Sequence, residues 1–285
     1  MASGTQVGCD VVMPTWNSNA FYFPAVVVHL VKELMPHHLI VVDRHSNDGT
    51  QDTVKKYVGD ICKLVELDSD LAWARKIGGM LADTDAVCFI DDDVLIPDGL
   101  RPYVYAVLNI VKKIPKIGAV AFSTCTSDTK KKITVSRVIK PLHAVSMAEV
   151  LAEGLHVPSR ALTFFFCIKR ELVATWTPPV YLSAYEDFHL SQHVARSGYV
   201  WIELATPCII HLKDLRFKGI TRYIKQGLWE GANAKLVGIP LRYILVHLIG
   251  RLVGAIARKK PHQFFTYIGY AFGLIAGEKY RKWKR

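Results

Sequence analysis

The stretch AVCFIDDD at residues 86–93 joins an uninterrupted apolar run to three adjacent carboxylates, Asp91, Asp92 and Asp93. A short continuous apolar run is typical of a strand that is covered on both faces of a parallel sheet. Carboxylates at the end of such a strand are costly to desolvate unless a cation binds them, and hard cations such as Mg²⁺ and Mn²⁺ take carboxylate oxygens. The alternative is a solvated acidic turn, and the triplet alone is compatible with both.

The chain before this strand repeats one pattern, in which a short apolar run precedes a polar loop and a segment with helical periodicity. We expect strands at 7–13, 39–43 and 61–66 and helices at 23–35, 51–58 and 71–82. Such alternation predicts an α/β sheet, whose ligands bind at the carboxyl ends of the strands. The polar loops at 15, at 43–50 and at 91–93 should therefore meet along one edge of the sheet.

The chain after the triplet is predicted to continue with mixed elements. We expect helices at 100–114, 185–197 and 221–236, strands at 117–124, 162–168, 201–204 and 208–212, and turns at 95–99 and 126–132. Residues 133–160 have no pattern that assigns them. Glu186 and Asp187 open one of these helices, where acidic side chains are favoured by the helix dipole, so capping alone is one explanation for them.

Composition narrows the classes of protein and partner. A net charge of +11 favours anionic partners such as nucleotide phosphates, an anionic membrane or nucleic acid. Neither GxGxxG nor GxxxxGK[ST] occurs, which argues against a dinucleotide dehydrogenase and a P-loop enzyme. The six cysteines are scattered without a CxxC pair, so we expect reduced core residues of an intracellular protein. The amino terminus has no secretory pattern.

Taken in order, these motifs resemble those of glycosyltransferase family 2 on the GT-A fold, across residues 7–235. The matching segments are PTWN at 14–17, DRHSNDGT at 43–50, ARKIG at 74–78, the triplet at 91–93 and ED at 186–187. The resemblance implies an α/β fold with a mixed, mainly parallel sheet flanked by helices. It also implies an inverting, metal-dependent glycosyltransferase of the hexosyltransferase type, which uses a UDP- or GDP-sugar.

The resemblance also implies a metal and donor site. Asp93 and Asp91 would hold Mn²⁺ or Mg²⁺, which neutralises the leaving diphosphate, and His211 would be an additional ligand unless it is a core or surface histidine. The implied donor-binding residues are Pro14, Thr15, Asn17, Asp43, Asp48, Arg75, Asp91 and Asp92. For Asp48 the alternative is a residue that turns the chain. Arg75 would pair with the diphosphate or with Asp43, and the alternative is a surface charge.

Asp187 is the implied general base, which removes the acceptor proton during a single displacement, and Glu186 would position the acceptor or tune Asp187. Three basic residues of the 213–219 loop, Lys213, Arg216 and Lys218, would close over the diphosphate, unless the loop is simply solvated. The second loop reads Asp43-Arg44 where many family members have two acids, which leaves the contact with the base open. The QxxRW motif of processive synthases is missing, so transfer of one sugar is expected.

The composition changes near residue 236, so we expect a catalytic domain at 1–235 and a basic helical tail at 236–285. Interfacial helices followed by a basic aromatic terminus favour peripheral binding to an anionic membrane, on its cytoplasmic face. The acceptor would then be lipid-linked or a glycan. A helical cap on the catalytic domain and a dimer interface are the alternatives.

Three other functions compete with this one. A sugar nucleotidyltransferase would need a glycine-rich basic loop after the first strand, and PTWN at 14–17 is not such a loop. A catalytically silent protein that binds a nucleotide sugar or a membrane is disfavoured by intact Asp93 and Asp187. A nucleic-acid binder fits worst, because the excess positive charge lies in the tail among apolar helices.

Overall fold

The computed structural model describes residues 8–19, 22–124, 134–141, 160–180, 182, 184–212, 220–234, 236–257 and 261–282. The chain forms two compact units, which we describe separately. The first comprises residues 1–139, 161–176 and 193–213, and the second comprises 140–160, 177–192 and 214–285. The predicted boundary at residue 235 stays a prediction.

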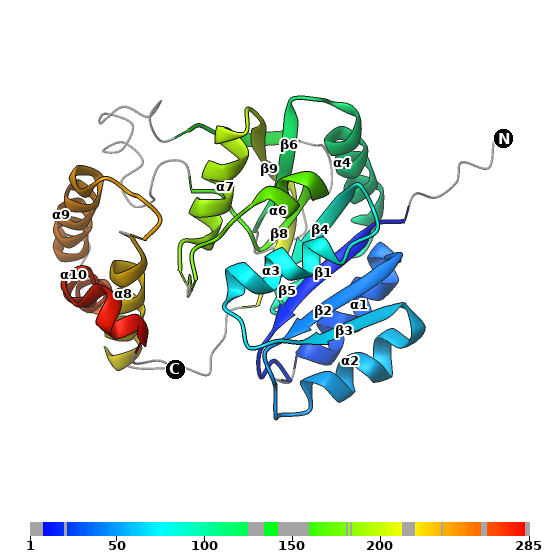
Figure 1. The fold of residues 1–285 in the computed structure, drawn as a ribbon, viewed down its shortest axis with the longest axis horizontal. Helices are drawn as coiled ribbons and strands as arrows, with labels where there is room; N and C mark the ends of the chain where they lie inside the picture. The colour runs from blue at the N-terminus through cyan, green and yellow to red at the C-terminus, as the bar shows by residue number, and fades with distance from the viewer. Residues whose placement is uncertain are drawn as a thin grey trace. The chain divides into compact units, whose positions relative to one another are not determined.

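The first unit is built on one mixed sheet (Figure 1). Its strands are β1 Asp10–Thr15, β2 His38–Asp43, β3 Cys62–Glu66, β4 Ala86–Ile90, β5 Val94–Leu95, β6 Ile117–Thr124, β7 Thr134–Ile139, β8 Phe165–Lys169 and β9 Val200–His211. The order is β3-β2-β1-β4-β8-β6-β9-β5, and β7 also pairs with β9. Strands β3, β2, β1 and β4 are parallel, whereas β8 runs antiparallel to both of its neighbours. This is the predicted mixed α/β sheet.

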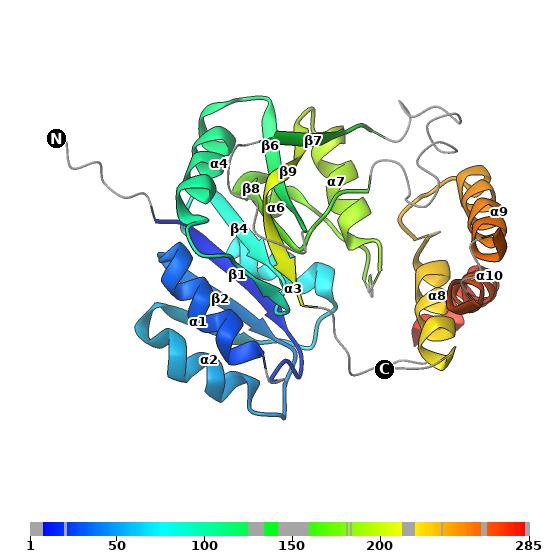
Figure 2. The same ribbon diagram turned by 180° about the vertical axis from the view of Figure 1, so that it is seen from behind.

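Helices cover both faces of this sheet. They are α1 Phe23–Leu34, α2 Thr50–Val58, α3 Leu71–Met80, α4 Arg101–Lys113 and α6 Arg170–Thr175, with a 3₁₀ turn η1 at Gly59–Ile61. Helices α3 and α6 lie toward the viewer in Figure 1, and α1 and α4 come to the front in Figure 2. Gly78 lets α3 approach closely, because a Cβ atom there would lie 3.2 Å from Cγ2 of Val42 and nearer still to Val12.

Four local predictions need correction. The strands expected at 201–204 and 208–212 are one strand, β9, because pairing with β6 continues past Pro207 through a register shift. Leu95, the first residue of the turn expected at 95–99, belongs to β5, which pairs with the end of β9. Strand β7 and helix α6 were not predicted, because six-residue segments carry too little periodicity to separate them from loops.

The cysteine prediction is also wrong. Strand β4 is antiparallel to β8 in a register that sets Cys88 opposite Cys167, with Cα atoms 4.1 Å apart, and the two form a disulfide. Cys208 is also in a disulfide, whereas Cys9 and Cys62 are free thiols. Sequence spacing does not reveal strand register across 79 residues, so the pairing had no local signal. The cysteines therefore no longer support an intracellular location.

The second unit contains α8 Ile220–Ala234, α9 Leu241–Ala257 and α10 Pro261–Lys282, which is interrupted at Gly277, and helix α7 Glu186–Arg196 begins in it. Helices α8 and α10 are in backbone contact through four glycines, Gly227 and Gly231 on α8 and Gly269 and Gly273 on α10. Each faces backbone atoms of the opposite helix, so a side chain at any of them would collide with main chain. Within the described residues, no helix has the length and apolar content needed to cross a membrane.

Candidate active site

Two parallel strands of the first unit end at a buried carboxylate. Asp43, the last residue of β2, is completely buried, and its neighbour across the sheet is Thr15 at the end of β1. Its oxygens accept hydrogen bonds from Thr15 Oγ1 at 2.9 Å, Ser46 N at 2.8 Å, Ser46 Oγ at 2.5 Å and Gln51 Nε2 at 2.8 Å. Burial raises the pKa of Asp43, but these donors outweigh it and hold the pKa below its ordinary value.

The four donors occupy the acceptor capacity of Asp43, since a carboxylate has about four lone-pair sites. Asp43 therefore shapes the loop in this structure, and its predicted contact with the donor stays a prediction. Pro14 lies one residue before Thr15, inside β1, opposite Val42.

The loop after β1 is tied to the loops after β2 and β4. Asn17 adopts a left-handed conformation with φ of 49°, its N–H donates to Ser46 Oγ at 2.7 Å, and its side-chain oxygen accepts from Asn47 N at 3.0 Å. The Ser18 hydroxyl donates to Asp92, the middle residue of the acidic triplet. The three polar loops thus meet along one edge of the sheet, as predicted.

Asp48 has the turning role that was the alternative to donor binding. One of its oxygens accepts from the Thr50 N–H at 3.1 Å and from the Thr50 hydroxyl at 2.5 Å, at the start of α2. The other accepts from Asn19 N at 2.9 Å. These bonds fix the loop in which a donor would have to bind, and direct contact between Asp48 and a donor stays a prediction.

Arg75 is a buried cation rather than the surface charge that was the alternative, with 1% of its side chain exposed. It donates to Asp91 Oδ1 at 2.7 Å and to the Thr163 carbonyl at 3.2 Å. Burial raises the pKa of Asp91 above its ordinary value, against the opposing effect of the Arg75 guanidinium. Asp91, rather than Asp43, is therefore the partner of Arg75 in this structure.

Asp93 and His211, which both belong to the first unit, come together across 118 residues of sequence. Strand β5 pairs with the end of β9 so that Val94 lies opposite His211, and His211 Nε2 is 3.0 Å from Asp93 Oδ2. Both side chains are about one quarter exposed. A carboxylate and an imidazole that share a partly solvated edge suit a divalent cation such as Mn²⁺. The residues present therefore fit the predicted metal. The same contact between Asp93 and His211 is also that of an ordinary ion pair.

The acidic pair Glu186 and Asp187 belongs to the second unit, at the start of α7. Both are buried, with 8% and 7% exposed. Asp187 Oδ2 lies 2.5 Å from Arg160 Nε, and that guanidinium also lies 5.1 Å from the centre of the Tyr185 ring. Burial lowers the pKa of Arg160, but the adjacent Asp187 carboxylate outweighs this effect and raises it.

Several residues of these sites were not predicted. Ser18 and Arg160 carried no sequence signal, because Ser18 is one polar residue of a loop and Arg160 ends a stretch without periodicity. Trp16, with 55% exposed, lies under Arg44 at 5.3 Å and offers an aromatic surface beside the predicted donor loops. Tyr185 adopts φ of 63°, which is uncommon for a bulky residue. The loop with Lys213, Arg216 and Lys218 lies outside the described residues.

A mixed sheet with helices on both faces, and with polar loops gathered at the carboxyl ends of β1, β2 and β4, has the GT-A architecture of nucleotide-sugar transferases. The sequence of residues 10–155, just over half of the chain, matches the family described as glycosyl transferase family 2. The chain therefore belongs to glycosyl transferase family 2. A comparison with curated protein sequences gave no match.

Solved structures of glycosyltransferases share this fold at low sequence identity. A mannosyltransferase from Pyrobaculum calidifontis, in complex with GDP-Man and Mn²⁺, is 18% identical with a TM-score of 0.59, over 97% of this chain and 87% of that one. Residues 1–349 of TarS from S. aureus are 13% identical with a TM-score of 0.53, over 96% and 91%. Glucosyl-3-phosphoglycerate synthase from Mycobacterium tuberculosis, with Mn²⁺, UDP and phosphoglyceric acid, is 17% identical with a TM-score of 0.54, over 82% and 79%.

Proposed function

We propose that this protein transfers one sugar from a UDP- or GDP-sugar to an acceptor, with inversion and with Mn²⁺ or Mg²⁺ as its cofactor. The observation that carries the proposal is the meeting of Asp93 with His211 beside the loops that end β1, β2 and β4. Family membership supports glycosyl transfer, and the similar folds include complexes with GDP-Man and with UDP, each with Mn²⁺. The metal would neutralise charge on the leaving diphosphate.

Each site has a distinct part in this mechanism. Asp93 and His211 would hold the metal, and the Arg75–Asp91 pair would fix the end of β4 against α3 and Thr163.

Asp43 and Asp48 would keep the donor loops in shape through their hydrogen bonds. Asp187 would act as the general base, and Arg160 would orient its carboxylate.

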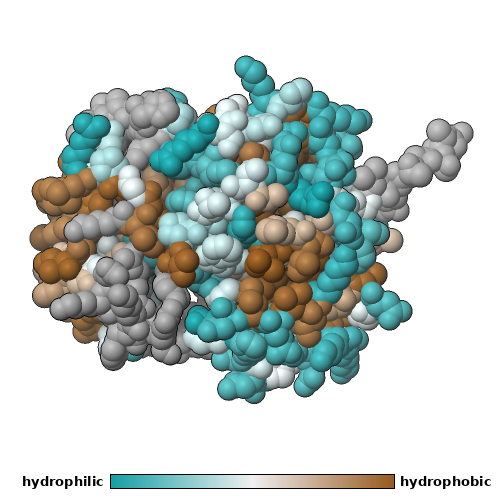
Figure 3. Space-filling view, in the orientation of Figure 1, coloured by the Kyte–Doolittle hydropathy of each residue, from teal (hydrophilic) through white to brown (hydrophobic). Residues whose placement is uncertain are grey.

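We further propose that the second unit binds the surface of an anionic membrane, where the acceptor is lipid-linked. Figure 3 shows apolar side chains gathered over α9 and α10. Large apolar residues on these helices are exposed by 45% to 84%. They are Leu241, Leu245, Ile249, Val253 and Ile256 on α9 and Phe272 and Ile275 on α10. The five on α9 follow spacings of four, four, four and three, which places them within about 120° of its surface.

Seven half-exposed side chains of this size would contribute on the order of 5–10 kcal/mol if lipid covered them. The net charge of +11 adds attraction to anionic headgroups. The same apolar face would also suit a second copy of the chain, so the experiment must separate the two.

The enzymatic proposal is tested by a screen of UDP- and GDP-sugars with Mn²⁺ or Mg²⁺, in which release of nucleoside diphosphate and sugar transfer are both followed. We expect Asp93→Ala to lower turnover by at least 100-fold, since a metal ligand is lost. Asp98→Ala is the matched control, because Asp98 is 68% exposed in the same connection before α4. Release of inorganic pyrophosphate instead would indicate a nucleotidyltransferase, and absence of any turnover would support a catalytically silent binder.

The general base has its own test. We expect Asp187→Asn to bind the donor as the wild type does and to lose transfer by about 100-fold or more. Transfer and diphosphate release at the wild-type rate would show that Asp187 is not the base.

Membrane binding is tested by sedimentation with vesicles that contain anionic lipid. We expect Ile249→Asp with Ile256→Asp to release the protein from the vesicles, whereas Val28→Asp, on an exposed face of α1, should leave binding unchanged. Wild-type protein that stays in solution with these vesicles and sediments as a dimer would contradict the membrane proposal.

A further inference from the structure

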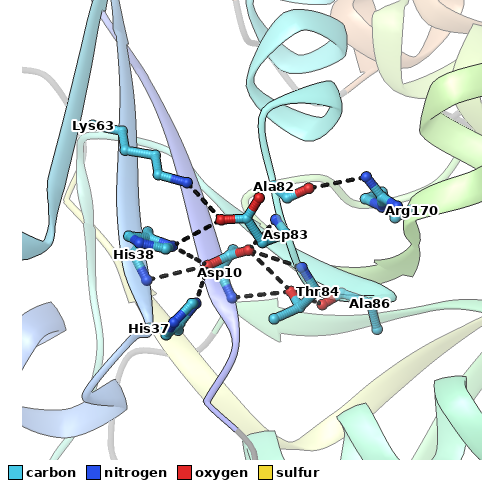
Figure 4. Close-up of polar contacts among 9 residues, drawn as sticks. All are labelled: Asp10, His37, His38, Lys63, Ala82, Asp83, Thr84, Ala86 and Arg170. Carbon is cyan, nitrogen blue, oxygen red and sulfur yellow. Dashed lines mark hydrogen bonds and ion pairs between the residues drawn. The ribbon is translucent and has the colours of Figure 1, made fainter.

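A second cluster of metal-ligating side chains lies at the amino ends of the strands, far from the acidic triplet. It comprises Asp10, His37, His38 and Asp83, which we call the amino-end cluster (Figure 4). Asp10 begins β1, His38 begins β2, and Asp83 precedes β4. Asp10 pairs with Val87, whereas the triplet begins at Asp91, so four residues of strand, or about 13 Å, separate the two.

The ligand atoms of this cluster converge on one point. One oxygen of Asp10 is 3.3 Å from His37 Nδ1 and 3.1 Å from His38 Nδ1, and His38 Nδ1 is 3.5 Å from an oxygen of Asp83. All four ligand atoms lie within 4.8 Å of one another. In the described part of the chain, no other group of three or more His, Cys, Asp or Glu residues meets that condition.

These separations match a tetrahedral metal site. Zinc binds imidazole nitrogen and carboxylate oxygen at about 2.0–2.2 Å, so two ligand atoms of a regular tetrahedron are about 3.3–3.6 Å apart. Three of the ligand pairs in the cluster have nearly this separation without any rearrangement. Two imidazoles with two carboxylates favour a borderline transition metal over Mg²⁺ or Ca²⁺, which prefer all-oxygen sites.

The Asp10 carboxylate does not need both histidines as hydrogen-bond donors. Asp10 is buried and already accepts backbone N–H bonds from Asp83 at 2.6 Å, Thr84 at 3.0 Å and His38 at 3.1 Å. These three bonds hold the starts of β1, β2 and β4 together and leave about one lone pair on the oxygen that faces both imidazoles. The Nδ1 atoms of His37 and His38 face the same Asp10 oxygen in addition to these backbone donors. In the tautomer that carries its proton on Nε2, each Nδ1 has a lone pair that could bind a metal.

We propose that the amino-end cluster is a structural Zn²⁺ site, distinct from the predicted catalytic metal. Two carboxylates and two neutral imidazoles carry a charge of −2, which a divalent ion balances. Without a metal, Lys63 Nζ neutralises part of this negative charge, because it lies 2.7 Å from Asp83. A bound ion would displace the Lys63 ammonium group from Asp83. The exposed side chains of His37 and Asp83 leave the site open to solvent, so the ion has a path of entry.

The test is titration of chelator-treated full-length protein with Zn²⁺, followed by calorimetry and by thermal unfolding. We expect one Zn²⁺ bound per chain at this cluster and a rise in Tm of about 5 °C at 100-fold excess over Kd. His37→Gln should weaken Zn²⁺ binding by at least 10-fold, since it removes one of the four side chains that would bind the ion directly. His37 is half exposed, so this variant should fold.

His29→Gln is the matched control, because His29 pairs with a single carboxylate, Asp98, at 3.8 Å. It should bind Zn²⁺ as the wild type does, and so should Asp93→Ala, which separates this site from the catalytic one. Absence of stoichiometric Zn²⁺ binding would overturn the proposal, and so would equal Zn²⁺ affinity and Tm shift in the wild type and a folded His37→Gln, His38→Gln double variant.

Discussion

Gly231 on α8 is a position where two physical effects oppose each other. Replacing it with alanine raises helix propensity by about 1 kcal/mol, because glycine loses more backbone entropy on folding. The new methyl carbon, however, would lie 2.9 Å from the backbone nitrogen of Leu274 and nearer still to the carbonyl oxygen of Tyr270. We predict that the collision outweighs the gain in propensity.

The size of the destabilisation by Gly231→Ala depends on which atoms must move to relieve the collision. The colliding atoms are main chain, so no rotamer change relieves them, and α8 and α10 must separate by about 1 Å to reach ordinary contact. Overpacking of this kind costs about 1–3 kcal/mol, and a separation of that size forfeits up to half of the dispersion energy of the affected atom pairs. Because main chain cannot rotate away, the upper end of that range, about 3 kcal/mol, applies, and after the gain in propensity of about 1 kcal/mol we expect a net loss of about 2 kcal/mol.

For a chain of this length, a loss of about 2 kcal/mol lowers Tm by about 5 °C. Thermal unfolding monitored by circular dichroism measures it. Ile275→Ala on α10 is the control, because Ile275 is 84% exposed and its truncation should change stability by less than about 0.5 kcal/mol. A Gly231→Ala variant as stable as the wild type or more stable would show that the two helices are not packed at backbone contact.

Two further predictions concern buried carboxylates. Asp43→Asn should lower the free energy of unfolding at pH 7 by about 1–2 kcal/mol, because its four donors lose a charged acceptor. The folded pKa of Asp43 lies below its ordinary value of 3.8, so its stabilisation is present above pH 3.8 and is lost as the pH falls through the folded pKa. Urea unfolding at pH 7 and at a series of pH values below 3.8 should show the two proteins converging as the pH falls, and a constant difference would contradict the assignment. Arg160→Ala should destabilise the protein by about 2–4 kcal/mol, because it leaves the buried Asp187 carboxylate without its cation; a change below about 0.5 kcal/mol in urea unfolding would be inconsistent with the pair.

Much of the fold follows from local patterns. Strands β1, β2 and β4 are continuous apolar runs because both faces of the sheet are covered, and the helices that follow β1 and β2 begin within one residue of their predicted starts. The polar loops after these strands had to meet, since parallel neighbours end at the same edge. The sequence therefore predicted where in the fold the candidate site lies. It predicted less well which side chains contact one another there.

The contacts depend on pairings that no local pattern encodes. His211 lies beside Asp93 because β5, a strand of two residues, pairs with the end of β9. The Cys88–Cys167 disulfide depends in the same way on the register of β4 and β8. Arg75 was predicted to bind or pair, but its burial against Thr163 required knowing where the chain returns 88 residues later.

Tyr185 directly precedes Glu186, and its hydroxyl lies 3.3 Å from that of Tyr270 on α10, with both side chains buried. The residue that directly precedes α7 is thus hydrogen-bonded to α10, a helix that we propose binds the membrane surface. A chain cut after residue 235 would lose this bond and would expose the glycine face of α8. Loss of activity in such a truncation would therefore not identify a membrane anchor, because the truncation also removes the hydrogen-bond partner of the residue next to the acidic pair. Point substitutions on the outer faces of α9 and α10 are the means to separate attachment from catalysis.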